Sequence, residues 1–180
     1  MKQVKVILVD NDDNPVGLMG KMEAHRKGLL HRAISVFIIN SAGEWILQKR
    51  AHDKYHSKGL WTNACCTHPL PGESELDSAN RRLSEEMGIV SNLKKVFSFI
   101  YKEKVDNNLT EHEYDHVFAG ISDIDPEINT REVVEWKKTS FEELHLDILN
   151  NPDNYTTWFK KIYQNVNDHL LMFPEFRTVR

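Results

Sequence analysis

The segment richest in reactive side chains is the run WTNACCTHPL at residues 61–70. It contains the two cysteines of the chain, Cys65 and Cys66, followed by His68 and Pro69. Alternate side chains of an extended segment share a face, so Cys66 and His68 are expected to point the same way. A thiol whose pKa is lowered by a charge or a metal can exchange a proton near neutral pH, which makes Cys66 a candidate acid or base. Taken alone, the pair is also explained by a buried cysteine beside a capping histidine.

A second candidate is the triplet Glu111-His112-Glu113. In a strand its two glutamates share a face, where they repel each other unless a cation lies between them. A solvated sheet edge explains this triplet equally well when it stands alone. Imidazole nitrogens and carboxylate oxygens together suit Mg²⁺, Mn²⁺ or Zn²⁺ and do not select one of them. The histidines that would complete such a site are His25, His31 and His68.

A charged run at residues 81–89, RRLSEEMGI, resembles the Nudix box, in which helix glutamates hold Mg²⁺ against a diphosphate. Two positions depart from that pattern, because Thr67 stands at the box glycine and Arg82 at the first helix glutamate. An amphipathic helix with a solvated charged face is the alternative interpretation. The residues that match the box are Glu73, Arg81, Glu85, Glu86 and Gly88.

The hydrophobic pattern predicts the elements that must position these residues. Strands are expected at residues 4–9, 33–39, 44–49, 96–105, 114–121 and 133–137, with turns at 40–43 and 106–108. Residues 51–59 are expected to form a polar loop. A helix at residues 75–87 should place Leu76, Ala79, Leu83 and Met87 on one face and end at Gly88.

The C-terminal part of the chain is predicted to be helical. Ser140 and Glu143 have the spacing of a capping box for a helix through Leu149, and Asn151-Pro152 is expected to open the last helix. The element order therefore predicts a single α/β (α+β) domain over residues 1–180, with a mixed sheet sandwiched between helices.

Composition narrows the class of protein. The 180 residues are 40% hydrophobic and carry a net charge of −4, so general nucleic-acid binding is not expected. No apolar stretch reaches the roughly 20 residues that span a bilayer, so no membrane association is expected either. Two adjacent free thiols fit a reducing, cytoplasmic setting. A monomer or a homodimer is expected.

The thiol segment, the altered box and the Glu-His-Glu triplet follow one another in an order and at distances that resemble the type I isopentenyl diphosphate isomerases, a Nudix-fold family. The resemblance extends from about Lys21 to Trp158. It implies interconversion of isopentenyl diphosphate and dimethylallyl diphosphate in isoprenoid biosynthesis, by metal-assisted protonation and deprotonation through a carbocation.

The resemblance also implies a role for each matched residue. It makes Cys66, Glu113, Tyr101 and Trp158 catalytic. The diphosphate of the small-molecule substrate would be held by Lys21, Arg50, Lys54 and Arg82. Mn²⁺, Mg²⁺ or Zn²⁺ would be bound by His25, His31, His68, Glu111 and Glu113, and a second, substrate-linked Mg²⁺ by Glu86.

Two other classes of protein compete with this interpretation. A Nudix hydrolase of a nucleoside diphosphate derivative would share the box, but Thr67 and Arg82 argue against it. A non-catalytic zinc module would use Cys65, Cys66 and His68, but adjacent cysteines crowd one metal and the chain has no second pair.

Overall fold

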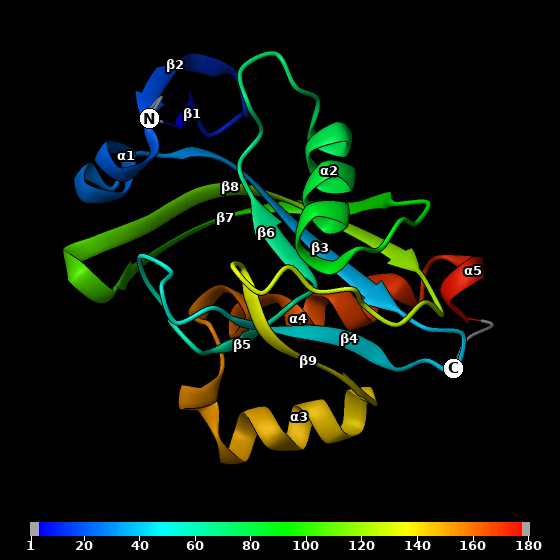
Figure 1. Cartoon of the computed structure of the whole chain (residues 1–180). Coiled ribbons are helices and arrows are strands. Elements are labelled where there is room, and N and C mark those ends of the chain that lie inside the picture. Colours follow the sequence, from blue (N-terminus) through cyan, green and yellow to red (C-terminus); the bar gives the residue numbers. More distant parts are fainter. Residues whose placement is uncertain (1–3, 178–180) are drawn as a thin grey trace.

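A mixed sheet forms the framework of the computed structural model, which describes residues 4–177 (Figure 1). Its strands are β1 (Lys5–Val9), β2 (Pro15–Gly20), β3 (His31–Ile39), β4 (Trp45–Arg50), β5 (Trp61–Thr62), β6 (Cys65–Thr67), β7 (Lys94–Val105), β8 (Leu109–Ile121) and β9 (Val133–Thr139). The helices are α1 (Lys21–Lys27), α2 (Glu75–Met87), α3 (Phe141–Asn150), α4 (Thr157–Leu170) and α5 (Pro174–Arg177), with 3₁₀ turns η1 (Asp106–Asn108) and η2 (Pro152–Asn154).

Strand β3 lies at the centre of this sheet. It pairs in parallel with β8 from His31 opposite Glu113 to Ile39 opposite Ile121, and antiparallel with β6, where Ser35 lies opposite Cys66. Strands β7 and β8 form a long hairpin, and β9 extends the sheet beside β4. Because β3 is covered on both faces, its residues from Ala33 to Ile39 are apolar except for Ser35, as is typical of a central strand.

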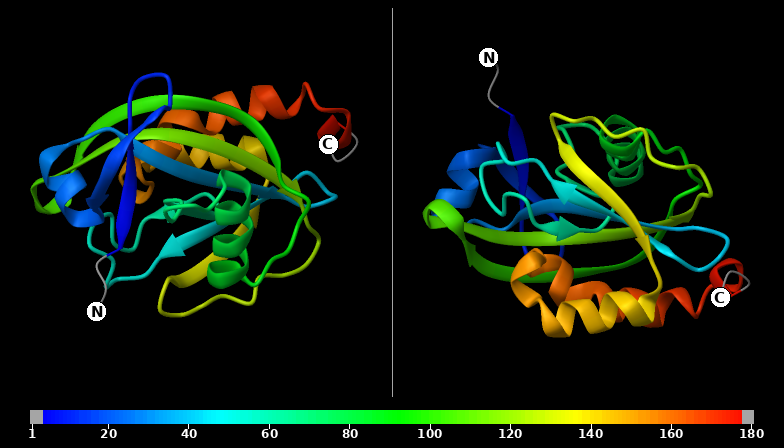
Figure 2. Two further views of the ribbon diagram at one scale, coloured as in Figure 1. Left: turned by 90° about the horizontal axis from the view of Figure 1, so that it is seen from above. Right: turned by 60° about the horizontal axis from the view of Figure 1, so that its bottom comes forward.

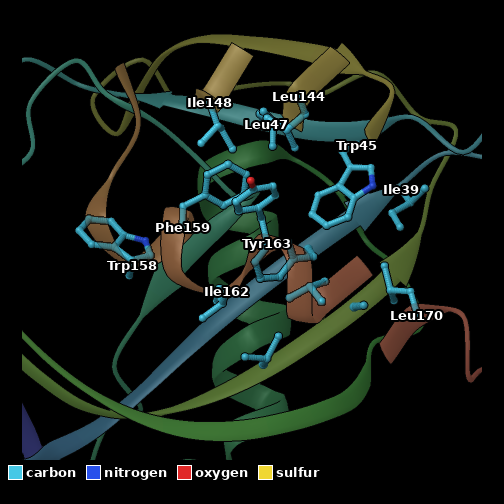
Figure 3. Packing of buried hydrophobic residues seen from close by; sticks show 14 of the residues in the cluster. Ile39, Trp45, Leu47, Leu144, Ile148, Trp158, Phe159, Ile162, Tyr163 and Leu170 are labelled. Carbon is cyan, nitrogen blue, oxygen red and sulfur yellow. The ribbon is translucent and has the colours of Figure 1, made fainter. Parts of the chain in front are cut away.

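Helices cover both faces of the sheet, as Figure 2 shows from two further directions. Ala79, Leu83 and Met87 of α2 pack against one face, together with Ile34 and Val36 of β3. The other face is covered by the aromatic and aliphatic side chains of α3 and α4, shown in Figure 3. This arrangement confirms the predicted helix–sheet–helix domain. Among residues 4–177, no helix has both the length and the apolar character needed to cross a membrane.

Several predicted elements are confirmed by their terminal residues. Helix α2 has the predicted bounds, and Gly88 ends it in the left-handed conformation at φ 67°. Ser140 and Glu143 form both hydrogen bonds of a capping box at the start of α3. The β7–β8 hairpin turns at the predicted asparagines, where Asn107 adopts φ 61°.

Other predictions are wrong in ways that the tertiary structure explains. Leu76 is 43% exposed although it has the angular position of the buried stripe, which begins in the structure at Ser78 and Ala79. The last helix begins at Thr157 rather than at Pro152, since Tyr155 is extended and forms a β-bridge with Trp61. Helices α1 and α5 and the short strands β2, β5 and β6 were not predicted.

Candidate active site

A cavity of about 270 Å³ opens where β6 and β8 flank β3. All of the site residues predicted from the sequence line it except His25 and His31, which lie fully buried within the same cluster of side chains. The predicted residues in its wall are Lys21, Arg50, Lys54, Cys66, His68, Arg82, Glu86, Tyr101, Glu111, Glu113 and Trp158.

Five of these predicted residues form what we call the histidine–glutamate cluster: His25, His31, His68, Glu111 and Glu113. They come from α1, the start of β3, the residue after β6, and β8. His68 Nε2 lies 2.9 Å from Glu113 Oε1 and 3.2 Å from His31 Nε2. His25 Nε2 lies 3.3 Å from Glu111 Oε1. The parallel pairing of β3 with β8 brings the group together, because it sets His31 directly opposite Glu113.

The hydrogen bonds of two histidines leave their inner nitrogens suited to bind a cation. His25 Nδ1 and His31 Nδ1 each lie 2.8 Å from a backbone carbonyl oxygen, that of Lys21 and that of Leu29 respectively. A carbonyl only accepts, so each Nδ1 carries the hydrogen and Nε2 of the neutral ring keeps its lone pair. Burial lowers the pKa of His31 to about 4 and that of His68 well below its usual value, which keeps both rings neutral. Neutral imidazoles and carboxylates form a donor set that fits a divalent cation.

The two glutamates of β8 differ in their electrostatics. Burial, followed by the adjacent Glu111, raises the pKa of Glu113 well above its usual value. Burial opposes ionisation of Glu111 as well, but contacts with His25 and His56 outweigh it and hold its pKa well below the usual range. Tyr101 Oη donates a 2.7 Å hydrogen bond to Glu113 Oε2. Glu113 is therefore the carboxyl whose charged form is the more strongly disfavoured, and its hydrogen bond with Tyr101 fixes its orientation.

The Cys66 thiol faces the cavity through an ordered set of polar contacts. Its Sγ donates to Asn63 Oδ1 at 3.2 Å and lies 3.7 Å from Ser35 Oγ, which itself donates to Asp115 Oδ2 at 2.7 Å. Burial, followed by the charge of Asp115, raises the pKa of Cys66 to about 12. The expected lowering is therefore not found, and the group carries its proton as a neutral thiol.

Cys65 points away from this site. It is fully buried among the apolar side chains between β3 and α2. The alternation of a strand separates the neighbouring cysteines onto opposite faces. This separation rules against the zinc module, since Cys65 and Cys66 do not approach one ion together.

Basic side chains occupy another part of the cavity wall. Arg82 contacts Glu86 one helical turn later and donates to Glu85 at 2.8 Å. Glu86 is 3% exposed and also accepts from Gln48 Nε2 at 2.9 Å. Burial lowers the pKa of Lys21 to about 8. Arg82 and Lys21, together with Arg50 and Lys54, form a cationic wall that suits a phosphate anion.

Some residues of the site were missed from the sequence. Glu132 contacts Lys54 and lies 3.5 Å from Arg82, so it links two of the predicted phosphate-binding cations. Asp115 follows Glu113 by two positions, so the period of two that paired the glutamates would have indicated it. His56 belongs to the segment expected to be a polar loop, yet it is buried beside Glu111. No local pattern in the sequence indicates that burial.

Comparison with known domain families and solved structures identifies the fold of this protein. The NUDIX domain family matches residues 29–164. The crystal structure of a Deinococcus radiodurans protein aligns with a TM-score of 0.74 at 18% identity, over 89% of this chain and 98% of the other. The MutT protein of Methanosarcina mazei gives a TM-score of 0.63 at 19% identity, over 77% and 94% of the two chains. The fold is therefore that of the NUDIX-domain proteins.

Proteins similar in sequence identify the family within the NUDIX-domain proteins. A Photorhabdus laumondii protein named isopentenyl-diphosphate Delta-isomerase 2 is 52% identical over 168 residues, which cover 91% of this chain and 95% of the relative. A Pectobacterium atrosepticum isopentenyl-diphosphate Delta-isomerase is 45% identical over 173 residues, covering 96% and 97%. The chain belongs to the isopentenyl-diphosphate Delta-isomerase family.

Proposed function

We propose that this protein interconverts isopentenyl diphosphate and dimethylallyl diphosphate in the cavity beside β3. The observation that carries the proposal is the placement of two groups that can exchange protons, Cys66 and Glu113, on strands that flank β3 on either side and face one cavity. A cationic wall for the diphosphate lies in the same cavity. Family membership supports the same reaction, and Arg82 at the position of a box glutamate favours it over hydrolysis.

The chemistry requires one proton to be added to a carbon and another to be removed from a different carbon. An unactivated alkene is a weak base, so the acid must be close to it and shielded from water. Cys66 and Glu113 would serve, one giving a proton and the other accepting one, with the roles exchanged in the reverse reaction. The hydrogen bond from Tyr101 would hold the Glu113 carboxyl in position.

Trp158 would stabilise the positive charge that develops on the substrate. Its indole is part of the core around α4 (Figure 3) and also lines the cavity. The Arg50 guanidinium lies over this ring, 5.2 Å from its centre, so the indole already makes one cation–π contact. A desolvated cation–π contact contributes about 2 kcal/mol or more.

The proposed reaction also requires divalent metal ions at two positions in the site. The histidine–glutamate cluster would hold Mn²⁺, Mg²⁺ or Zn²⁺, and Glu86 would be the ligand of a second Mg²⁺ that binds with the diphosphate. A divalent cation beside Glu113 would fix the orientation of the carboxyl and alter its acidity. Binding energy from the diphosphate would position the alkene without taking part in the chemistry. A cytoplasmic location fits the two free thiols, and the protein would act as a monomer or a homodimer.

Direct assay of isomerisation tests the proposal. Isopentenyl diphosphate is incubated with the protein in D₂O, and NMR follows formation of dimethylallyl diphosphate and uptake of deuterium. We expect conversion in the presence of Mg²⁺ together with Mn²⁺ or Zn²⁺, and loss of conversion after chelation. A parallel assay measures phosphate release from nucleoside diphosphate derivatives. Turnover of those compounds, with no isomerisation under any metal condition, would establish the hydrolase instead.

A further inference from the structure

Asn63 lies between β5 and β6 and is fully buried. Its Nδ2 donates to the backbone carbonyl oxygen of Val36 at 3.1 Å and to that of Cys65 at 2.8 Å. A carbonyl only accepts, so both amide hydrogens are committed and the positions of the amide nitrogen and oxygen follow from these contacts. Asn63 Oδ1 is therefore the atom that faces the thiol, and Cys66 Sγ donates to it at 3.2 Å.

Two threonines hold this amide oxygen from the side of the core. Thr62 Oγ1 donates to Asn63 Oδ1 at 2.9 Å, and Thr156 Oγ1 donates in turn to Thr62 Oγ1 at 3.0 Å. Both threonines are fully buried, and Thr156 is the N-cap residue of α4, the helix that carries Trp158. A buried chain of hydrogen bonds therefore runs from the start of α4 to the amide oxygen that the thiol contacts.

The second polar neighbour of the thiol has a weaker hold on it. Ser35 Oγ lies 3.7 Å from Cys66 Sγ and gives its own hydrogen to Asp115 Oδ2 at 2.7 Å. The sulfur thus receives a hydrogen bond from neither neighbour, and its lone pairs remain available to a molecule in the cavity. Because the contact with Asn63 is the shorter one and the amide has no freedom to turn, Asn63 determines where the thiol hydrogen points.

We propose that Asn63 is a positioning residue for Cys66, fixing the direction of the S–H bond and the place of the sulfur in the cavity; the inference rests on the part that the proposed function gives to Cys66. Proton exchange with an alkene needs close alignment, since a misplacement of about 1 Å can cost roughly a hundredfold in rate. The wall of the cavity includes Cys66 and Ser35 but not Asn63. Loss of the amide should therefore affect turnover and not substrate binding.

The infrared S–H stretching band tests the contact directly. The chain has two cysteines, so the variant Cys65→Ala retains the band of Cys66 alone. A thiol that donates a hydrogen bond absorbs at a lower frequency than a free thiol. We expect the Cys66 band at the frequency of a bonded thiol, and a shift toward that of a free thiol when Asn63→Ala is added. A free-thiol band in Cys65→Ala itself would overturn the proposal without any change at Asn63.

Steady-state kinetics test what the contact does for the reaction. Asn63→Ala should lower kcat about tenfold to a hundredfold and leave the KM for isopentenyl diphosphate largely unchanged. An unchanged kcat would overturn the proposal, and so would a KM that rises as much as kcat falls, because that pattern indicates a general disturbance of the site. Absence of isomerisation in the unmodified protein would overturn the proposed function and this role with it, whereas an unshifted band in an active enzyme overturns this role alone.

Asn40→Ala is the matched control. Asn40 is 6% exposed, and its Oδ1 accepts from the backbone N–H groups of Ala42 and Glu44 at 3.0 and 2.8 Å. Its loss removes a buried amide without touching Cys66, so the S–H band and kcat should stay unchanged. Asn63→Ser serves where alanine prevents folding, because its hydroxyl can still donate to a carbonyl but is too short to reach the thiol. An unshifted band in folded Asn63→Ser would contradict the proposal.

Discussion

At the scale of single residues, the adjacent cysteines have separate environments. Cys65 packs among apolar side chains in the core, whereas Cys66 contacts Asn63 and Ser35 at the cavity. A buried cysteine that only packs behaves as a small apolar side chain. A thiol that faces a cavity between polar contacts is instead available to react with a bound molecule.

We therefore expect Cys66→Ala to abolish isomerisation and Cys65→Ala to retain most of the turnover. The Cys65 variant should lose about 1 kcal/mol of stability, typical of a point substitution in a core. Turnover numbers and urea unfolding of both variants provide the measurement, with Cys66→Ser as the variant of similar size. Equal loss of turnover in the two alanine variants would remove Cys66 from the mechanism.

Arg82 is the residue that most directly distinguishes this site from that of a hydrolase. It shares the cavity-facing side of α2 with Glu86, and the two side chains are in contact. We expect Arg82→Ala to raise the KM for isopentenyl diphosphate about tenfold to a hundredfold, the range for losing a hydrogen bond to a charged group, with a smaller effect on kcat.

The control for this variant is Arg26→Ala, which removes a cation from an exposed position on α1. Arg82→Glu restores a glutamate at the box position and should still not release phosphate, because the attacking water and its base are not supplied. An unchanged KM in Arg82→Ala would mean that Arg82 is a solvated helix residue and that α2 does not contribute to substrate binding.

At the scale of elements, helix α2 connects the core to the cavity. One face packs on the sheet through Leu83 and Met87, while Arg82 and Glu86 on another face line the cavity. The stability of the helix against the sheet therefore determines how firmly the phosphate-binding wall is held.

Two leucines of α2, one buried against the sheet and one exposed, test how much the sheet-facing side of the helix contributes to stability. Leu83→Ala should cost about 2–5 kcal/mol, because it opens a cavity in a fully buried position. Leu76→Ala should change stability by less than about 0.5 kcal/mol, since the side chain is exposed. Free energies of unfolding from urea titration give both values. A large cost at Leu76 would show that the first turn of α2 contributes to the core despite the exposure of this side chain.

At the scale of the whole molecule, the histidine–glutamate cluster joins parts that are far apart in the chain. Its residues come from α1, β3, β8 and the segment after β6. An ion bound there would hold α1 against the sheet as well as serve the chemistry. Metal binding should therefore stabilise the fold as a whole.

We expect removal of the divalent cation to lower the melting temperature. A ligand at a hundredfold excess over its Kd stabilises by about 2.7 kcal/mol, which corresponds to roughly 5–10 °C for a chain of this length. Calorimetry with chelator, and again after Mn²⁺ or Zn²⁺ is restored, measures the shift. His68→Ala should abolish the difference and His52→Ala should retain it. Identical melting temperatures with and without metal in the unmodified protein would contradict a bound ion at this cluster.

Short-range periodicity made much of the fold predictable from the sequence. The apolar pattern of residues 33–39 and the spacing of Ala79, Leu83 and Met87 are local consequences of strand and helix geometry, and both are found in the structure. The same geometry placed Glu111 and Glu113 on one face and separated Cys66 from Cys65. These relations need only neighbouring residues, so the amino-acid order by itself determines them.

Relations between distant segments were decided by the tertiary structure. The pairing of β3 with β8 brings His31 next to Glu113, and this depends on a strand register that no local pattern specifies. The burial that raises the pKa of Cys66 and encloses His56 arises only when several elements close around a cavity. Desolvation and long-range packing are properties of the assembled fold. The sequence therefore determined which groups were available for chemistry, and the tertiary structure determined which of them meet and in which state of protonation.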